Sequence, residues 1–222
     1  MSLDNVIIFG SSGHAKVVID IIENEGRHKI IGLLDSYRAI GETTFDYPVL
    51  GSEDDLPAIS KLYPNVKLFV AVGDNWRRYE IVNKIRMLCP SMDFVSVIHP
   101  AAQIGRDVSI GVGVAIMAGV VVNCNSVIGG FSILNTNSSL DHDCFMSDFS
   151  SLAPAVTIGG NVSIGELTAI SIGATVKNGL SIGKQSVIGA SSLLLNNCGD
   201  NLIMYGVPAK MIRTRLCDDP YL

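Results

Sequence analysis

The second half of the chain carries an aliphatic residue at every sixth position without a slip. The residue four places after each of these positions is small or apolar, and glycine often follows the aliphatic residue directly. A fixed period of this kind indicates a solenoid, and a six-residue period indicates a parallel β-helix. The sixteen aliphatic positions are Ile104, Ile110, Ile116, Val122, Ile128, Leu134, Leu140, Met146, Leu152, Ile158, Ile164, Ile170, Val176, Ile182, Ile188 and Leu194.

An even period returns each strand residue to the same face of its sheet, so the aliphatic residue can fill the interior of every coil. The small residue four places later is expected to share that interior near a corner. Glycine and polar residues between these two positions are expected to permit the turns. Three hexads close a triangular coil of eighteen residues, which gives about five coils between residues 101 and 199, each stacked on its neighbours.

The first hundred residues lack the six-residue period and alternate short apolar runs with helical stripes, a pattern typical of a small parallel sheet with helices. We therefore expect an α/β domain over residues 1–99 and a β-helix domain with a C-terminal tail over residues 100–222. The expected strands are 6–9, 30–34, 67–72 and 94–98, and the expected helices are 15–25 and 76–88.

Three loops of the first domain follow expected strands and carry ligand-type groups: Gly10–His14, Asp35–Ser36 and Gly73–Asn75. Ligands of parallel sheets bind beyond the carboxyl ends of the strands. The first loop lacks the G-x-G-x-x-G spacing, so a dinucleotide is not indicated. Its glycines and the following helix N-terminus suit a phosphate or ribose, although the same glycines would equally serve a tight turn.

His142 is the side chain in the repeat most suited to chemistry. It follows the inward residue Leu140 by two places, so it should project outward or at a corner, and no other hexad carries a histidine there. Asp143 beside it can accept the Nδ1 proton and raise the basicity of the other nitrogen. We interpret His142 as a general base with Asp143 as its partner.

The eighteen-residue coil predicts the neighbours of His142. Cys124 lies one coil before it and Gly160 one coil after, where the exposed backbone N–H of a glycine can act as an oxyanion donor. Asn135, one hexad earlier on an adjacent wall, can orient a nucleophile. Cys144 occupies the small inward slot and is assigned to the core.

Composition restricts the classes of partner. The net charge of −5 and the pI near 5.3 argue against nucleic-acid binding, which needs a basic surface. Five cysteines without metal spacing suit a reducing cytoplasm. No apolar run approaches the ~20 residues of a membrane span, and no export signal is recognisable. No metal is expected.

The chain resembles the hexapeptide-repeat sugar acyltransferases of the sialic acid O-acetyltransferase and bacillosamine N-acetyltransferase type over nearly its whole length. The motifs that carry the resemblance are Ile8–His14, Ile133–Thr136, His142–Cys144 and Gly206–Lys210. The resemblance implies that the β-helix is left-handed and that His142 is the general base. Asp143 stands where a longer glutamate is common in the family.

The resemblance also implies two substrates, acetyl-CoA and a sugar or nucleotide-linked sugar. The front loops would bind the acceptor through Ser12, Gly13, His14, Asp35, Ser36 and Gly73. Acetyl-CoA would contact Ser151, Ile172, Ala190 and Lys210, although some family members have a second histidine where Ser151 stands.

Other functions are also compatible with parts of this pattern. The sequence does not decide between an amine and a hydroxyl acceptor, so sialic acid O-acetylation stays open, as does a non-catalytic scaffold. A γ-type carbonic anhydrase needs three zinc histidines, and the repeat has one. Apolar residues on the outer coil faces, namely Met117, Val121 and Ile133, predict a homotrimer.

Overall fold

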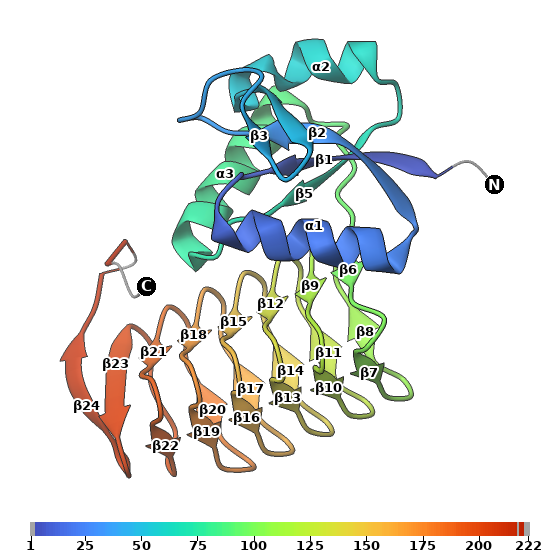
Figure 1. Ribbon diagram of the computed structural model, residues 1–222. Helices are drawn as coiled ribbons and strands as arrows, with labels where there is room; N and C mark the ends of the chain where they lie inside the picture. The colour runs from blue at the N-terminus through green and yellow to red at the C-terminus, as the bar shows by residue number, and fades with distance from the viewer. Residues whose placement is uncertain (1–2, 217, 220–222) are drawn as a thin grey trace. The chain divides into compact units, whose positions relative to one another are not determined.

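The computed structural model describes residues 3–216 and 218–219, and these form two compact units. The first unit comprises the chain up to Gly73 together with Arg77–Pro100. The second comprises Asp74–Trp76 and the described residues from Ala101 onward. Figure 1 shows the helices and sheet of the first unit in blue to green and the coils of the second in green to red.

The first unit is built on a five-stranded sheet in the order β3-β4-β2-β1-β5, in which all pairs but β3–β4 are parallel. The inner strand β1 is buried from Val6 to Phe9, as expected of a parallel strand covered on both faces. The strands are β1 Asp4–Phe9, β2 His28–Leu34, β3 Thr43–Thr44, β4 Tyr47–Gly51 and β5 Lys67–Val70. The helices are α1 Gly13–Glu25, the 3₁₀ turn Glu53–Asp55, α2 Leu56–Leu62 and α3 Asn75–Leu88.

Two features of this unit differ from the sequence-based expectation. The expected strand 94–98 is reduced to one bridge between Phe94 and Leu68 and the two-residue strand β6, Val97–Ile98, because the segment leaves the sheet edge after exchanging hydrogen bonds with Leu68 alone. The elements β3, β4 and α2 were not predicted, since they are short and show neither clear alternation nor a helical stripe. Among the described residues, no helix is long and apolar enough to cross a membrane.

The second unit is a parallel β-helix of two-residue strands, which confirms the fold indicated by the hexads. Each strand pairs in register with the strand eighteen residues further on, as Leu140 does with Ile158. The strands are β7 Gln103–Ile104, β8 Ser109–Ile110, β9 Ala115–Ile116, β10 Val121–Val122, β11 Val127–Ile128, β12 Ile133–Leu134, β13 Ser139–Leu140, β14 Phe145–Met146, β15 Ser151–Leu152, β16 Thr157–Ile158, β17 Ser163–Ile164, β18 Ala169–Ile170, β19 Thr175–Val176, β20 Ser181–Ile182, β21 Val187–Ile188 and β22 Leu193–Leu194.

The coils have three faces, one for each set of stacked strands. The first contains β9, β12, β15, β18 and β21, the second contains β7, β10, β13, β16, β19 and β22, and the third contains β8, β11, β14, β17 and β20. The antiparallel hairpin of β23, Leu202–Gly206, and β24, Ala209–Thr214, extends the first face at its C-terminal end.

The interior of the coils is filled as the repeat predicts. The hexad aliphatic residues from Ile116 to Leu194 are at most 2% exposed, whereas Ile104 in the first coil is 37% exposed. The small residues also face inward, and several of their hydroxyls bond to backbone carbonyls of the next coil, as Ser126 Oγ does to Asp141 O at 2.8 Å. Coils therefore protect one another's cores, and the first coil lacks a neighbour on one side.

The corners turn at one of the residues between the aliphatic and the small position, where Gly and polar residues were expected to permit the turn. Each turn places the third residue after the aliphatic position in the left-handed region, with φ of 58° at Asn125 and 56° at Asp143. The glycine that follows the aliphatic residue serves close approach instead. A Cβ on Gly165 would lie 2.4 Å from the Lys184 backbone nitrogen of the next coil.

The apolar residues cited for a trimer interface do not form an open outer face. Met117 is 1% and Ile133 4% exposed in the single chain, and only Val121, at 38%, is accessible. The apolar-face argument for a trimer is therefore wrong for Met117 and Ile133. Any argument for self-association has to come from other features of the coils.

Candidate functional site

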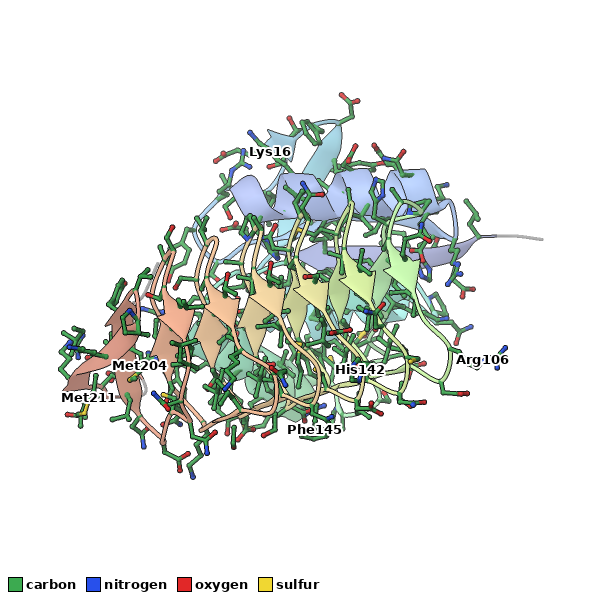
Figure 2. All side chains as sticks on the ribbon, turned by 90° about the horizontal axis from the view of Figure 1, so that it is seen from below. Lys16, Arg106, His142, Phe145, Met204 and Met211 are labelled. Atoms are coloured by element: carbon green, nitrogen blue, oxygen red, sulfur yellow. The ribbon has the colours of Figure 1, made fainter. Side chains whose placement is uncertain are left out.

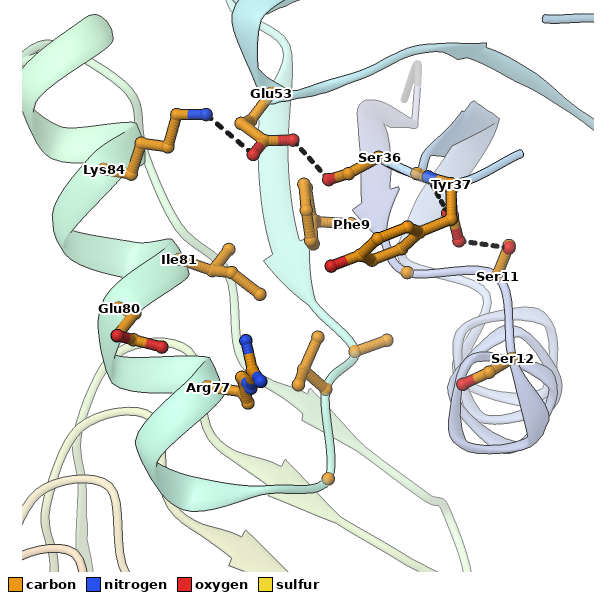
Figure 3. A pocket seen from close by; sticks show the side chains of 15 residues that line it. Phe9, Ser11, Ser12, Ser36, Tyr37, Glu53, Arg77, Glu80, Ile81 and Lys84 are labelled. Carbon is orange, nitrogen blue, oxygen red and sulfur yellow. Dashed lines mark hydrogen bonds and ion pairs between the residues drawn. The ribbon is translucent and has the colours of Figure 1, made fainter. Parts of the chain in front are cut away.

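The first unit contains a cavity of about 460 Å³ at the carboxyl ends of its strands, within the size range of small-ligand sites. Ser11 and Ser12 follow β1, Asp35 and Ser36 follow β2, and Gly73 follows β5. Helix α3 supplies the opposite wall, with Arg77 directed into the cavity (Figure 3). The other lining residues are Phe9, Gly10, Tyr37, Glu53, Ala71, Val72, Glu80, Ile81 and Lys84.

The backbone at the floor of the cavity is fixed by close packing. A Cβ on Gly10 would lie 2.8 Å from the carbonyl oxygen of Ala71, and the φ of Gly10 is 107°. The buried guanidinium of Arg78 donates to the carbonyls of Val72 and Gly73 at 2.8 and 2.9 Å. Gly10 therefore has a structural role in the turn, and Arg78 fixes the loop after β5.

Charged groups of both signs line the walls (Figure 3). Ser11 donates to Asp35 Oδ2, and Asp35 Oδ1 accepts the Tyr37 N–H at 2.9 Å. Glu53 joins the two walls by accepting from Ser36 at 2.6 Å and from Lys84 at 2.8 Å. Burial alone raises the pKa of Glu53, but these two bonds outweigh it and the carboxyl pKa falls below its ordinary value.

The cavity contains four of the six residues predicted to bind the acceptor: Ser12, Asp35, Ser36 and Gly73. Gly13 and His14 are not among its lining residues. The Nε2 of His14 is buried and makes no hydrogen bond to the described residues. Burial and then the charge of Arg78 lower its pKa to about 4, so the ring is neutral at physiological pH.

Sequence reasoning missed the aromatic and charged walls of the cavity. Tyr37 is 93% exposed and extends across the cavity (Figure 3), while Arg77 and Lys84 lie on α3, a helix whose exposed residues show no ligand motif. The sequence signal that could have found these residues is their position directly after the ligand-type loops. Tyr37 follows Asp35-Ser36 directly, and Arg77 follows the loop after β5.

In the second unit, His142 projects from the coil surface (Figure 2) at the corner between β13 and β14. Its Nδ1 donates to Asp143 Oδ2 at 2.7 Å, and its backbone N–H donates to Asp141 Oδ1 at 2.8 Å. Each acid is also held by an amide one coil earlier, Asp141 by Asn123 at 2.7 Å and Asp143 by Asn125 at 3.3 Å. This set is called the His142 corner below.

The electrostatics of this corner favour a basic imidazole. The Asp143 hydrogen bond, followed by the charge of Asp141, raises the pKa of His142 above its ordinary value. The His142 hydrogen bond, followed by that of Asn125, lowers the pKa of Asp143. With Nδ1 committed to the carboxylate, the lone pair at Nε2 can accept a proton.

Gly160 lies one coil beyond His142 with its N–H unused. The N–H groups on either side of it bond within the helix, Gly159 to Val176 O at 3.0 Å and Asn161 to His142 O at 2.9 Å. Within residues 3–216 and 218–219, the Gly160 N–H has no acceptor. At the matching hexad position, the N–H of Gly130 donates to an aspartate at 2.7 Å.

The other predicted residues lie elsewhere on the coil. Asn135, Ile172 and Ala190 lie at the corner between the first and second faces, called the Asn135 corner, and the Oδ1 of Asn135 accepts the Thr136 N–H at 2.8 Å. Ser151 begins β15 on the first face, and Lys210 lies on the terminal hairpin. A strand of the second face separates the Asn135 corner from the His142 corner in every coil.

Cysteine and metal chemistry have no evident place here. The Cys144 thiol is buried and donates to Gly159 O at 3.3 Å, and burial raises its pKa. Cys89, Cys124, Cys144 and Cys198 are all unpaired thiols. In the part of the chain that the structure describes, no group of three or more His, Cys, Asp or Glu side chains could hold a metal ion.

Comparison with known proteins identifies similar chains. Residues 5–85 match the PglD N-terminal domain family. A histidine-to-asparagine variant of perosamine N-acetyltransferase from Caulobacter crescentus, solved in complex with CoA and GDP-perosamine, superposes with a TM-score of 0.89 at 34% identity and covers 96% of this chain and 98% of that one. The acetyltransferase domain of PglB from Neisseria gonorrhoeae, solved with acetyl coenzyme A, gives 0.87 at 30% identity over 95% and 100%.

Among curated sequences, UDP-N-acetylbacillosamine N-acetyltransferase of Bacillus subtilis is 30% identical over 116 residues, or 52% of each chain. That match therefore spans about half the length of the curated relative. GDP-perosamine N-acetyltransferase of Escherichia coli O157:H7 is 26% identical over 180 residues, or 78% of each chain. These relatives share chemistry on an amino group of a nucleotide-linked sugar.

Proposed function

Because this chain belongs to the hexapeptide-repeat family of sugar acetyltransferases, we propose that it transfers the acetyl group of acetyl-CoA to an amino group of a nucleotide-linked sugar. The observation that carries this is the His142 corner, an imidazole with one nitrogen fixed by a carboxylate and the other open to a substrate. An amine acceptor is favoured over a hydroxyl because three similar proteins, at 26–34% identity, are N-acetyltransferases of bacillosamine or perosamine.

The proposed reaction uses His142 as general base. Nε2 takes a proton from the acceptor amine as its nitrogen attacks the thioester carbonyl, and Asp143 stabilises the imidazolium that forms. The Gly160 N–H donates to the carbonyl oxygen as it becomes an oxyanion. When the tetrahedral intermediate collapses, the C–S bond breaks and coenzyme A leaves as a thiolate, which takes the proton from His142 and becomes the thiol. The Caulobacter complexes with CoA and GDP-perosamine, solved with a histidine replaced, support a histidine at the centre of the chemistry.

We assign the cavity of the first unit to the nucleotide of the acceptor. Tyr37 offers a flat aromatic face, Asp35 and Ser36 offer polar groups for a base or ribose, and Arg77 offers a cation for phosphates. His14 stays a predicted acceptor contact, outside this cavity. Ser151, Ile172, Ala190 and Lys210 stay the predicted contacts of acetyl-CoA.

We infer that the working form is a homotrimer. Asn135, Ile172 and Ala190 lie at one corner of the triangular coil and His142 at the next. A site that uses both sets is completed when the Asn135 corner of one chain meets the His142 corner of a second. Three copies close such a ring with equivalent contacts. A sedimentation mass equal to a single 23.6 kDa chain would contradict it.

Among the described residues, the four unpaired thiols, two of them buried, suit a reducing compartment, and we propose that the enzyme works in the cytoplasm.

The activity is tested by incubating the purified chain and acetyl-CoA with GDP-perosamine, a UDP-linked 4-amino sugar or free sialic acid. We expect thiol release and an acetylated product by mass spectrometry with a nucleotide-linked amine. Acetylation of sialic acid alone would reverse the acceptor assignment, and no release with any acceptor would favour a scaffold.

The role of His142 has its own test. Replacing His142 by Ala should lower kcat by about 10²–10⁴-fold, the range for losing a general base, while acetyl-CoA affinity is retained. Near-normal turnover, or an acetyl group trapped on Cys144, would contradict the mechanism.

A further inference from the structure

Three consecutive coils converge on the imidazole of His142. Backbone hydrogen bonds fix their stacking, since the Asp143 N–H donates to Cys124 O at 3.1 Å and the Asn161 N–H to His142 O at 2.9 Å. The ring itself is nevertheless half exposed, with 49% of its side chain accessible. Burial therefore does not determine its orientation, and the few groups that touch it must do so.

The coil before the histidine affects the orientation of the ring indirectly, because its Asn125 contacts the Asp143 carboxylate. Asn125 Nδ2 donates to Asp143 Oδ1 at 3.3 Å, while Asp143 Oδ2 accepts from His142 Nδ1 at 2.7 Å. Asp143 is itself 46% exposed, so its carboxylate would otherwise rotate in water. The amide occupies one oxygen and leaves the other directed at the ring.

The coil after the histidine affects the position of the ring because Gly160 has no side chain. A Cβ there would lie 2.6 Å from His142 Nε2, 2.7 Å from Cε1 and 3.1 Å from Cδ2. The backbone of Gly160 is outside the left-handed region, so an L-residue would fit its φ. The imidazole is what excludes a side chain, and its reactive edge rests over the bare Cα.

We propose that Asn125 and Gly160 are positioning residues for the catalytic histidine: Asn125 holds the carboxylate that orients the ring, and Gly160 leaves the space that the ring occupies. This assignment rests on the proposed function of His142 as general base. For Gly160 the role is steric and separate from the donation by its N–H.

Two substitutions test this proposal, Asn125→Gly and Gly160→Ala, and each has a matched control elsewhere in the coil. Asn125→Gly removes the amide and keeps the freedom to adopt φ of 58°. Asn137→Gly removes an amide from a corner with φ of 57° in a column without a carboxylate. Gly160→Ala adds a methyl against the ring, whereas Gly130→Ala adds one at the same hexad position, where the closest atom is Val112 O at 3.3 Å.

The first readout is the titration of His142 by NMR in the full-length, substrate-free protein, which has four histidines and so permits assignment with His142→Ala. The groups beside the ring are the carboxylates of Asp141 and Asp143 and the backbone of Gly160. In the parent, Asp143 and then Asp141 raise the pKa of His142. We expect Asn125→Gly and Gly160→Ala to lower the titration midpoint toward that of a free histidine, and both controls to leave it unchanged.

The second readout is kinetic. We expect kcat to fall at least about tenfold in Gly160→Ala and less in Asn125→Gly, with the KM for acetyl-CoA and the thermal midpoint close to those of the controls. A parental titration in both variants would overturn the proposal whatever the activity. Absence of acetyl transfer in the parent, with the titration shifted as expected, would instead contradict the proposed function and leave the positioning intact.

Discussion

In the proposed reaction His142 can act as a base only while its ring is neutral, so the acid beside it has opposing effects. Asp143 makes Nε2 a stronger proton acceptor, but the same hydrogen bond raises the pKa of His142 and so reduces the neutral fraction near neutral pH. At the His142 corner, a stronger base is therefore accompanied by a smaller fraction of neutral imidazole. The backbone of the corner does not restrict the acid to aspartate, since Gln185 and Leu167 adopt φ of 55° and 59° at the matching hexad position.

Replacement of Asp143 by Asn tests this balance. The variant keeps a residue that tolerates φ of 56° and loses the charge that raises the pKa of His142, so the acidic limb of the pH–rate profile should move to lower pH. The plateau kcat should fall, by less than in His142→Ala. A profile measured at saturating substrates decides it, and a midpoint displaced to higher pH would contradict the assigned cause.

At this scale the sequence predicted the unusual residues well. His142 was recognisable because it is the one histidine in the repeated hexads, and Asp143 because it directly follows that histidine. Tyr37 and Lys84 carried no such mark, because a loop residue and one helical lysine look like solvated surface until the chain folds. Asn125 was equally hidden, since asparagine is common at left-handed corners.

Among the elements, the loops after β1, β2 and β5 and one face of α3 form the cavity that we propose binds the nucleotide. Each loop alone offers one or two polar groups. Parallel alignment of the strands brings all three loops to one edge. The expected strand 94–98 failed for a related reason, because pairing at a sheet edge depends on the path of the chain as well as on its apolar residues.

Tyr37→Ala tests the aromatic wall. Stacking on an aromatic side chain contributes about 1–3 kcal/mol for each base, so GDP or UDP should bind about 5- to 100-fold more weakly by calorimetry. Pyrophosphate binding should be unchanged. Tyr63→Ala, which removes a tyrosine outside this cavity, is the control. Equal losses for pyrophosphate and nucleotide would show that Tyr37 supports the loop instead of the base.

Truncation of an interior aliphatic residue should lower the free energy of unfolding by different amounts in different coils. Leu152 is fully buried between two neighbouring coils, and Leu152→Ala should lower the free energy of unfolding by about 2–5 kcal/mol. Ile104 occupies the same slot in the first coil but is 37% exposed, so Ile104→Ala should cost about 1 kcal/mol or less. Urea unfolding followed by circular dichroism compares them, and equal costs would contradict the dependence on neighbouring coils.

For the whole molecule, the separation of the Asn135 and His142 corners makes shared sites testable. His142→Ala and Asn135→Ala chains should each be nearly inactive alone. Mixed after reversible dissociation, they should regain part of the activity, because one interface of a mixed ring carries both parental corners. Sites complete within one chain would give no recovery. Refolding each variant alone is the control.

The assembly was the level least accessible from sequence. The apolar outward positions Met117 and Ile133 looked like an interface, but both are buried within the single chain. A hexad pattern states which residues face inward and leaves open what covers the outward ones. The stacking of residues eighteen apart was predictable because backbone geometry sets it.

The period of the coil also sets a rule for how such chains can change length. An insertion of eighteen residues between Gly160 and Ile172 would translate everything that follows by one strand spacing, roughly 4.8 Å, and keep every column in phase. An insertion of six would instead rotate the rest of the chain by a third of a revolution, carrying Ile172 and Ala190 to another edge of the prism. Growth by whole revolutions preserves the active corner, and growth by a single hexad dismantles it.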